Sequence, residues 1–223
     1  MVKRAENAGY EAIVLTVDTV TLGWREADMR HGFSPLAAGY GQGNFETDEV
    51  FLSMLETIDS ESIVQGIIEN INHPSLNWND LKELKKRTSL PILLKGILDP
   101  ADALLAIEHG VDGIIVSNHG GRQLDGVISS IDALSEIVSS VNGQIPVLYD
   151  SGIRRGIDAL KALALGADAV LIGRPFVYSL VVGGETGVQQ FLTNLLQDFQ
   201  SSMMLAGVSN MKELRSLRVV RDY

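Results

Sequence analysis

Five short apolar runs constrain the fold of this chain more than any other feature of its sequence. They span residues 12–17, 91–95, 113–117, 145–150 and 169–173. None of them alternates apolar with polar residues, which is typical of strands that are buried on both faces of a parallel sheet. Their content of Ile and Val favours a strand over a helix. We therefore predict five strands at these positions.

Segments with the spacing of amphipathic helices separate the later runs. Apolar residues recur at helical intervals over residues 131–141 and again over residues 157–163. Strand and helix thus alternate from Pro91 onward, which predicts an α/β fold with right-handed crossovers. An open doubly wound sheet and an incomplete (β/α)8 barrel both fit this pattern, because a closed barrel needs eight strands and five are visible.

The long segment between the first two runs, residues 19–76, breaks this rhythm. We expect a lid-like insertion here, with helices near residues 47–56 and 59–70. For residues 32–44 taken alone, a disordered insertion fits equally well. Residues 186–206 have the pattern of a long helix. No linker or low-complexity tract interrupts the chain, so we interpret all 223 residues as a single domain.

Composition excludes several classes of function. The chain has 18 Lys and Arg against 28 Asp and Glu, a formal charge of −10, so it lacks the basic surface of a general nucleic-acid binder. It has no cysteine for a disulfide or a thiol nucleophile, and its four histidines lack the spacing of metal ligands. No apolar run reaches the roughly 18–20 residues of a membrane span, and neither end carries a targeting signal. We expect a soluble, cytoplasmic protein without a membrane partner.

Polar and charged residues follow every apolar run. In both candidate architectures, ligands bind at the carboxyl ends of the strands, so these residues are expected to meet at one rim. In chain order they are Thr16, Asp18 and Arg25 at or after the end of the first run, Lys95 at the end of the second, Ser117, His119 and Arg122 at or after the end of the third, Asp150, Gly152 and Arg154 at or after the end of the fourth, and Gly173 and Arg174 at or after the end of the fifth.

The last two strand ends have the pattern of a phosphate site. SGIRRG follows the fourth run, IGRP follows the fifth, and both lead into helix-like segments. Glycine lets the backbone approach an anion, helix N-termini direct N–H groups at it, and arginine binds it with two N–H groups. Taken singly, Lys95, His119 and the arginines also fit ordinary surface residues. Their collection at one rim favours a ligand site with a phosphate after the last two strands.

Five segments together resemble one known family. LTVDTVTLGWREAD, LPILLKG, GIIVSNHGGRQLDG, IPVLYDSGIRRG and ALALGADAVLIGRP, in this order, resemble the FMN-dependent α-hydroxy acid oxidising enzymes, which include glycolate oxidase and lactate oxidase. SNHGGRQLDG is the most specific of these segments. TLGW, the GYGQGNFETD loop and YDSG, where glycolate oxidases typically read DGG, are most similar to the lactate 2-monooxygenase branch. The resemblance implies a (β/α)8 barrel of which strands four to eight are visible here, so that the chain lacks the N-terminal strands.

The resemblance also implies roles for the residues at the strand ends. His119 would be the base that takes a proton from the substrate, and Asp18 would stabilise its imidazolium. Arg122 would bind the substrate carboxylate, with Arg25 assisting. Lys95 would lie near the flavin edge where negative charge develops on reduction. The residues implied to bind the FMN cofactor are Thr16, Lys95, Ser117, Asp150, Gly152, Arg154, Gly173 and Arg174.

The implied activity is the oxidation of a small L-2-hydroxy acid, such as lactate, to the 2-oxo acid or its decarboxylated product. O2 is a candidate electron acceptor, and a homo-oligomer is expected. One alternative is an inactive remnant that keeps a flavin or phosphate site, because residues that the missing strands supply have no counterpart here. Another is a different FMN barrel, such as an isopentenyl diphosphate isomerase-like enzyme. GADAVLIGRP would permit that enzyme, whereas the histidine and arginine of SNHGGRQ argue against it.

Overall fold

The structure is a computed structural model that describes residues 1–220. The chain forms two compact units, and each is described by itself. The first, here called the sheet unit, comprises Ala12–Asp18, Pro91–Gly121 and the chain from Asp125 onward. The second, here called the helical unit, comprises Met1–Glu11, Thr19–Leu90 and Arg122–Leu124.

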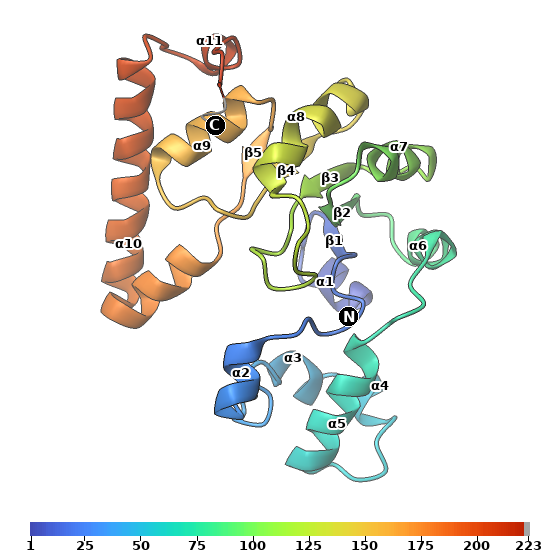
Figure 1. Ribbon diagram of the computed structural model, residues 1–223. Coiled ribbons are helices and arrows are strands. Elements are labelled where there is room, and N and C mark those ends of the chain that lie inside the picture. Colours follow the sequence, from blue (N-terminus) through green and yellow to red (C-terminus); the bar gives the residue numbers. More distant parts are fainter. Residues whose placement is uncertain (221–223) are drawn as a thin grey trace. The chain divides into compact units, whose positions relative to one another are not determined.

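A five-stranded parallel sheet organises the sheet unit (Figure 1). Its strands follow the chain order β1-β2-β3-β4-β5, and all five predicted strands are confirmed. Because neighbouring strands are parallel, their carboxyl ends lie along one edge of the sheet. The strands are β1 (Ile13–Thr16), β2 (Ile92–Ile97), β3 (Gly113–Val116), β4 (Val147–Tyr149) and β5 (Ala169–Val170).

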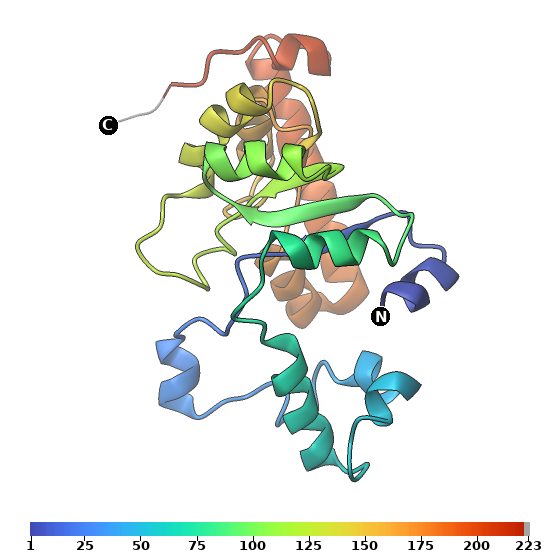
Figure 2. The ribbon, with the colours of Figure 1, turned by 90° about the vertical axis from the view of Figure 1, so that its right-hand side faces the viewer.

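Helices connect successive strands from β2 onward, as the alternating pattern predicts (Figures 1 and 2). Asp99 and Ser129 begin two of them by accepting N–H groups from Ala101 and Asp132, which is ordinary N-cap chemistry. The buried faces of these helices and the fully buried strand β3 form the core of the unit. The helices of this unit are α7 (Pro100–Glu108), α8 (Ser130–Val141), α9 (Gly156–Ala164), α10 (Arg174–Leu205) and α11 (Met211–Leu214).

Helix α10 differs from the helix expected over residues 186–206. It begins earlier, at Arg174, and consists of two segments that meet at Gly183 and Gly184, which have non-helical backbone angles. Gly184 has a φ of 58°, a left-handed conformation that glycine adopts without steric cost. Figure 1 shows the sharp change of direction at this point. The expected helix is therefore the second segment of α10.

The second segment of α10 packs closely against α9. Gly156, the first residue of α9, faces the backbone of Leu195 and Phe199, so that a side chain at position 156 would collide with it. Leu160 and Leu163 of α9 pack with Phe199 in the same hydrophobic cluster. Asp198 accepts an N–H from Ile157 at 3.2 Å and so caps α9 from the neighbouring helix. This contact fixes the start of α9, which directly follows the predicted phosphate segment.

The helical unit contains the long insertion. Phe51, Ile63 and Ile67 form its small core, and the Phe45 and Phe51 rings meet edge to face at 5.1 Å. The helix expected near residues 59–70 is confirmed as α5. The one expected near residues 47–56 is wrong in length, because the chain turns at Ser53 after one helical turn. The helices here are α1 (Val2–Asn7), α2 (Glu26–His31), α3 (Gly43–Glu46), α4 (Glu49–Leu52), α5 (Ser60–Ile71) and α6 (Trp78–Lys85). Across residues 1–220, helices lack the combination of length and apolar character that a bilayer crossing requires.

Candidate active site

A histidine and an aspartate meet at the carboxyl edge of the sheet. His119 lies in the loop after β3, and its Nδ1 is 3.0 Å from Oδ1 of Asp18, which follows β1. The histidine side chain is 31% exposed and that of the aspartate 15%, so the pair is shielded but reachable. A carboxylate at Nδ1 favours the tautomer with its proton there, which leaves the Nε2 lone pair to accept a proton.

Two backbone features hold this pair. His119 has a φ of 57°, unusual for a residue with a side chain, and its N–H donates to Ser117 Oγ at 3.0 Å. Gly96 lies beside Asp18 so closely that a side chain at position 96 would collide with the Asp18 backbone nitrogen and Cβ. The close approach of these two strand ends therefore requires a glycine.

A lysine and an aspartate form a second pair at the same edge. Lys95 of β2 donates from Nζ to Ser117 Oγ at 3.0 Å and lies 3.1 Å from Oδ2 of Asp150, the residue after β4. Their side chains are 17% and 15% exposed, so water screens this ion pair less than one on the surface. Thr16 of β1 is paired in register with Lys95. The structure thus brings four predicted cofactor residues to neighbouring strand ends.

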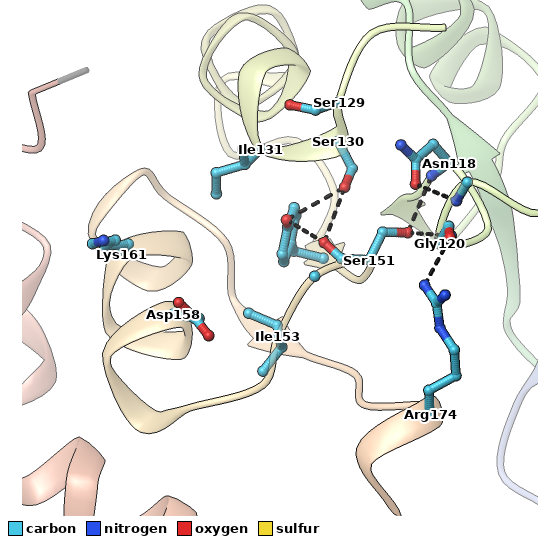
Figure 3. Close-up of a pocket in the computed structure, with 13 residues that line it drawn as sticks. Asn118, Gly120, Ser129, Ser130, Ile131, Ser151, Ile153, Asp158, Lys161 and Arg174 are labelled. Atoms are coloured by element: carbon cyan, nitrogen blue, oxygen red, sulfur yellow. Dashed lines mark hydrogen bonds between the residues drawn. The ribbon is translucent and has the colours of Figure 1, made fainter. Parts of the chain in front are cut away.

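Ser151 joins the loops after β3 and β4 (Figure 3). Its Oγ accepts the N–H of Asn118 at 3.3 Å and that of Gly120 at 2.9 Å, and donates to Asp150 Oδ1 at 2.7 Å. In the same view Arg174 reaches the Gly120 carbonyl oxygen, to which it donates at 2.7 Å. The sequence prediction did not assign Ser151 a role. The signal was present, because this serine stands in YDSG where the family resemblance leads us to expect glycine.

A cavity of about 520 Å³ opens beside these loops. Its walls include backbone at Gly120, Gly121 and Gly152 and the side chains of Ser130 and Tyr149. Burial raises the pKa of the Tyr149 phenol above its ordinary value, so the phenol stays protonated near neutral pH.

Two polar contacts in this wall also escaped the sequence prediction. The Tyr149 phenol donates to the Ser151 carbonyl at 2.6 Å, and Ser130 Oγ donates to the Asp150 carbonyl at 2.8 Å. Both side chains fix the backbone after β4. They lie within a strand and at the first turn of a helix, where polar residues carry no sequence signal of a site.

Two of the predicted phosphate-binding residues are glycines with open space beside them. A Cβ built at Gly173 would meet nothing within 4 Å, and one at Gly152 would meet only the Tyr149 hydroxyl at 3.9 Å. The Arg154 side chain is exposed, and its backbone N–H donates to Asp158 at the start of α9. Glycine backbone and arginine side chains suit a phosphate, whereas the N–H groups at the start of α9 already donate to Asp158 and Asp198. The residues present therefore fit a phosphate-bearing cofactor.

The two predicted carboxylate-binding arginines belong to the helical unit. Arg122 is exposed, and its neighbour Gln123 donates to the Thr21 carbonyl at 2.9 Å and accepts the Gly23 N–H at 3.3 Å. Nε of Arg25 is buried without a hydrogen-bond partner among the described residues. Within this unit, Gln123 thus ties the Arg122 segment to the stretch that leads to Arg25.

The chain belongs to the FMN-dependent dehydrogenase family, which matches residues 1–221. The family resemblance is confirmed, and with it FMN as the cofactor that this family uses. Among its relatives is L-lactate oxidase from Lysinibacillus sphaericus (strain C3-41), 60% identical over 222 residues, or 100% of this chain and 58% of that protein. 2-Hydroxyacid oxidase 1 from Homo sapiens is 47% identical over 212 residues, or 95% of this chain and 57% of that protein.

Solved structures of mandelate oxidase share the fold. One of them superposes with a TM-score of 0.79 at 40% identity, and covers 97% of this chain and 58% of the solved chain. This chain therefore spans less than two thirds of the length of the relatives it matches. The comparison confirms the fold prediction of an incomplete (β/α)8 barrel with five parallel strands.

Proposed function

We propose that the site oxidises a small L-2-hydroxy acid, with lactate as the first candidate, using FMN. The observation that carries the proposal is the contact of 3.0 Å between His119 Nδ1 and Asp18 Oδ1 at the carboxyl edge of a parallel sheet. A relative with 60% identity is named L-lactate oxidase, and others are named for 2-hydroxy acids or glycolate, which supports this substrate class. O2 is the acceptor that the name oxidase favours.

His119 is the proposed base. Its Nε2 takes a proton from the substrate, and the imidazolium that forms is stabilised by the Asp18 carboxylate at Nδ1. Arg122 is the proposed partner of the substrate carboxylate, because a guanidinium binds a carboxylate through two parallel N–H groups. Arg25 is proposed to assist it. The product is the 2-oxo acid or, after loss of carbon dioxide, its decarboxylated form.

FMN, when bound, supplies the electron-accepting ring for this oxidation. We assign its ring to Thr16, Lys95 and Ser117, which are the last residue of β1, a residue of β2 and the residue after β3. Lys95 contributes a positive charge, which would stabilise a ring that becomes negative. The ribityl chain and phosphate are assigned to Asp150, Gly152, Arg154, Gly173 and Arg174.

A flavin titration followed by anaerobic L-lactate tests the proposal. FMN binding to the purified chain is measured first, and loss of the flavin absorbance band is followed after lactate is added. We expect binding and bleaching in the wild type. His119→Gln should still bind FMN but should reduce it at least about 100-fold more slowly, because proton abstraction is lost. Equal reduction rates in both proteins would remove His119 from the mechanism.

Other outcomes of the flavin titration would favour one of the two alternative functions, an inactive remnant or a different FMN barrel. FMN binding without bleaching would favour a remnant with a cofactor site and no chemistry, a reading that the five-stranded sheet motivates. Bleaching by neither lactate nor glycolate, with turnover of isopentenyl diphosphate, would favour a different FMN barrel. Sedimentation of the chain tests the expected homo-oligomer.

A further inference from the structure

We propose that Ser151 is a positioning residue that locks the His119 loop to the Lys95–Asp150 ion pair. The inference rests on the proposed function, since it concerns how the proposed base and the proposed flavin-facing cation are kept in one arrangement. Ser151 itself is assigned no contact with substrate.

The hydroxyl of Ser151 uses its full hydrogen-bonding capacity between two loops. It accepts the backbone N–H groups of Asn118 and Gly120, which flank His119, and donates its own proton to Asp150. A hydroxyl has one proton to donate and two lone pairs to accept with, so all three are occupied. Two successive loops of the sheet are therefore joined through one oxygen atom (Figure 3).

The contacts close into a ring. Ser117 Oγ accepts from both the His119 N–H and Lys95 Nζ, Lys95 pairs with Asp150, and Asp150 accepts from Ser151. Ser151 in turn accepts the N–H groups of Asn118 and Gly120, which belong to the loop that carries His119 and Ser117. Such a ring couples its members, because displacement of one bond strains the others. Without the Ser151 hydroxyl, the loop after His119 would lose the acceptor of the Gly120 N–H and would keep the Arg174 bond to the Gly120 carbonyl.

The backbone conformation of Ser151 is one that favours glycine over serine. Ser151 has a φ of 78°, a left-handed conformation that glycine adopts freely and that a side chain makes unfavourable. Glycine would relieve this strain but would supply no hydroxyl. Asn142, at the end of α8, has a φ of 48° and provides a matched control away from these loops.

The test compares Ser151→Gly and Ser151→Ala with Asn142→Gly. Amide hydrogen exchange at Asn118 and Gly120 should become about tenfold faster in both Ser151 variants, since each amide loses its acceptor, and should stay unchanged in Asn142→Gly. The Ala variant keeps the backbone strain and the Gly variant removes it. A lower thermal midpoint in Ser151→Ala than in Ser151→Gly would therefore separate strain from hydrogen bonding. Unchanged exchange at both amides would overturn the inference.

The catalytic arm measures anaerobic flavin reduction at saturating FMN. Both Ser151 variants should reduce flavin about tenfold more slowly at saturating lactate while the KM for lactate changes less than about twofold, because the base is misplaced and the carboxylate partner is not. Wild-type rates in variants with faster exchange would overturn the positioning role and leave a structural one. If the wild type itself reduces no flavin, the proposed function fails, while the exchange arm still decides whether Ser151 anchors the loop.

Discussion

The sheet unit and the helical unit hold their proposed functional residues in different ways. In the sheet unit, Lys95 lies within β2, and Asp18 and His119 follow β1 and β3, so the register of these strands fixes the positions of all three residues. In the helical unit, Arg122 and Arg25 lie on loop segments that the Gln123 side chain joins through its hydrogen bonds to Gly23 and Thr21. Topology thus places the proposed proton chemistry, and loop contacts place the proposed substrate recognition.

Among the variants that test this difference between the two units, we expect the largest effect from Arg122→Lys. If Arg122 binds the substrate carboxylate and takes no part in the chemical step, the KM for lactate should rise about 10- to 100-fold, because lysine cannot form a bidentate hydrogen bond to a carboxylate. The maximal rate of flavin reduction and the affinity for FMN should change far less. Stopped-flow reduction over a range of lactate concentrations measures both constants.

Arg87→Lys is the matched control, an exposed arginine of the same unit. It should leave KM and the maximal rate at their wild-type values. A large loss of maximal rate in Arg122→Lys with an unchanged KM would assign Arg122 to the chemical step. Substrate binding and proton chemistry would then not be divided between the two units.

The same difference explains how much of the fold could be predicted. A continuous local run of apolar residues predicts a strand, so all five strands were found, although β1 and β5 contain no buried residue. The bend at Gly184 and the short α4 were missed, because each depends on packing with residues distant in sequence or on one backbone angle. Helix propensity alone cannot report either.

For the site too, the sequence predicts which residues meet at one edge of the sheet but not the contacts between them. Polar residues at strand ends are visible in the sequence, so His119, Asp18 and Lys95 were predicted together, and the structure places them at one edge. Their mutual contacts were not predictable, because the distance from Lys95 to Asp150 depends on the register of three strands. The roles of these residues remain predictions that the proposed experiments test.

Gly156→Ala tests how tightly the sheet unit is packed. Its new methyl group would collide with the α10 backbone at Leu195 and Phe199, and overpacking of this kind costs about 1–3 kcal/mol. Urea unfolding followed by circular dichroism should show this loss. Both tryptophans, Trp24 and Trp78, belong to the helical unit, so their fluorescence reports that unit separately.

Gly43→Ala in the helical unit is the counterpart, because a Cβ there would meet nothing within 4 Å. It should leave stability unchanged or slightly higher, since alanine restricts the unfolded chain. If Gly156→Ala also shifts the tryptophan transition, the two units unfold together, and the comparison between them holds for function but not for stability.

The smallest expected effect is a dependence of stability on pH that both units share. Asp198 in the sheet unit accepts the Ile157 N–H, and Asp48 in the helical unit accepts the Phe51 N–H at 3.0 Å. These backbone hydrogen bonds are the main cause that lowers the pKa of each carboxyl below its ordinary value. A carboxyl with a lower pKa in the folded state stabilises the protein above its unfolded pKa of about 3.9, and this contribution is lost as the pH falls through the folded pKa.

Urea unfolding midpoints measured between about pH 6 and pH 3 test this expectation, because the range includes the unfolded carboxyl pKa of about 3.9. Asp198→Asn should flatten the acid side of the circular dichroism profile, and Asp48→Asn should flatten the tryptophan profile. Asp102 is the control of opposite sign, because burial raises its pKa. Its protonation favours the folded state, so Asp102→Asn should make the loss of stability on acidification steeper. If Asp198→Asn and Asp48→Asn both keep the wild-type profile, neither helix cap contributes to acid stability.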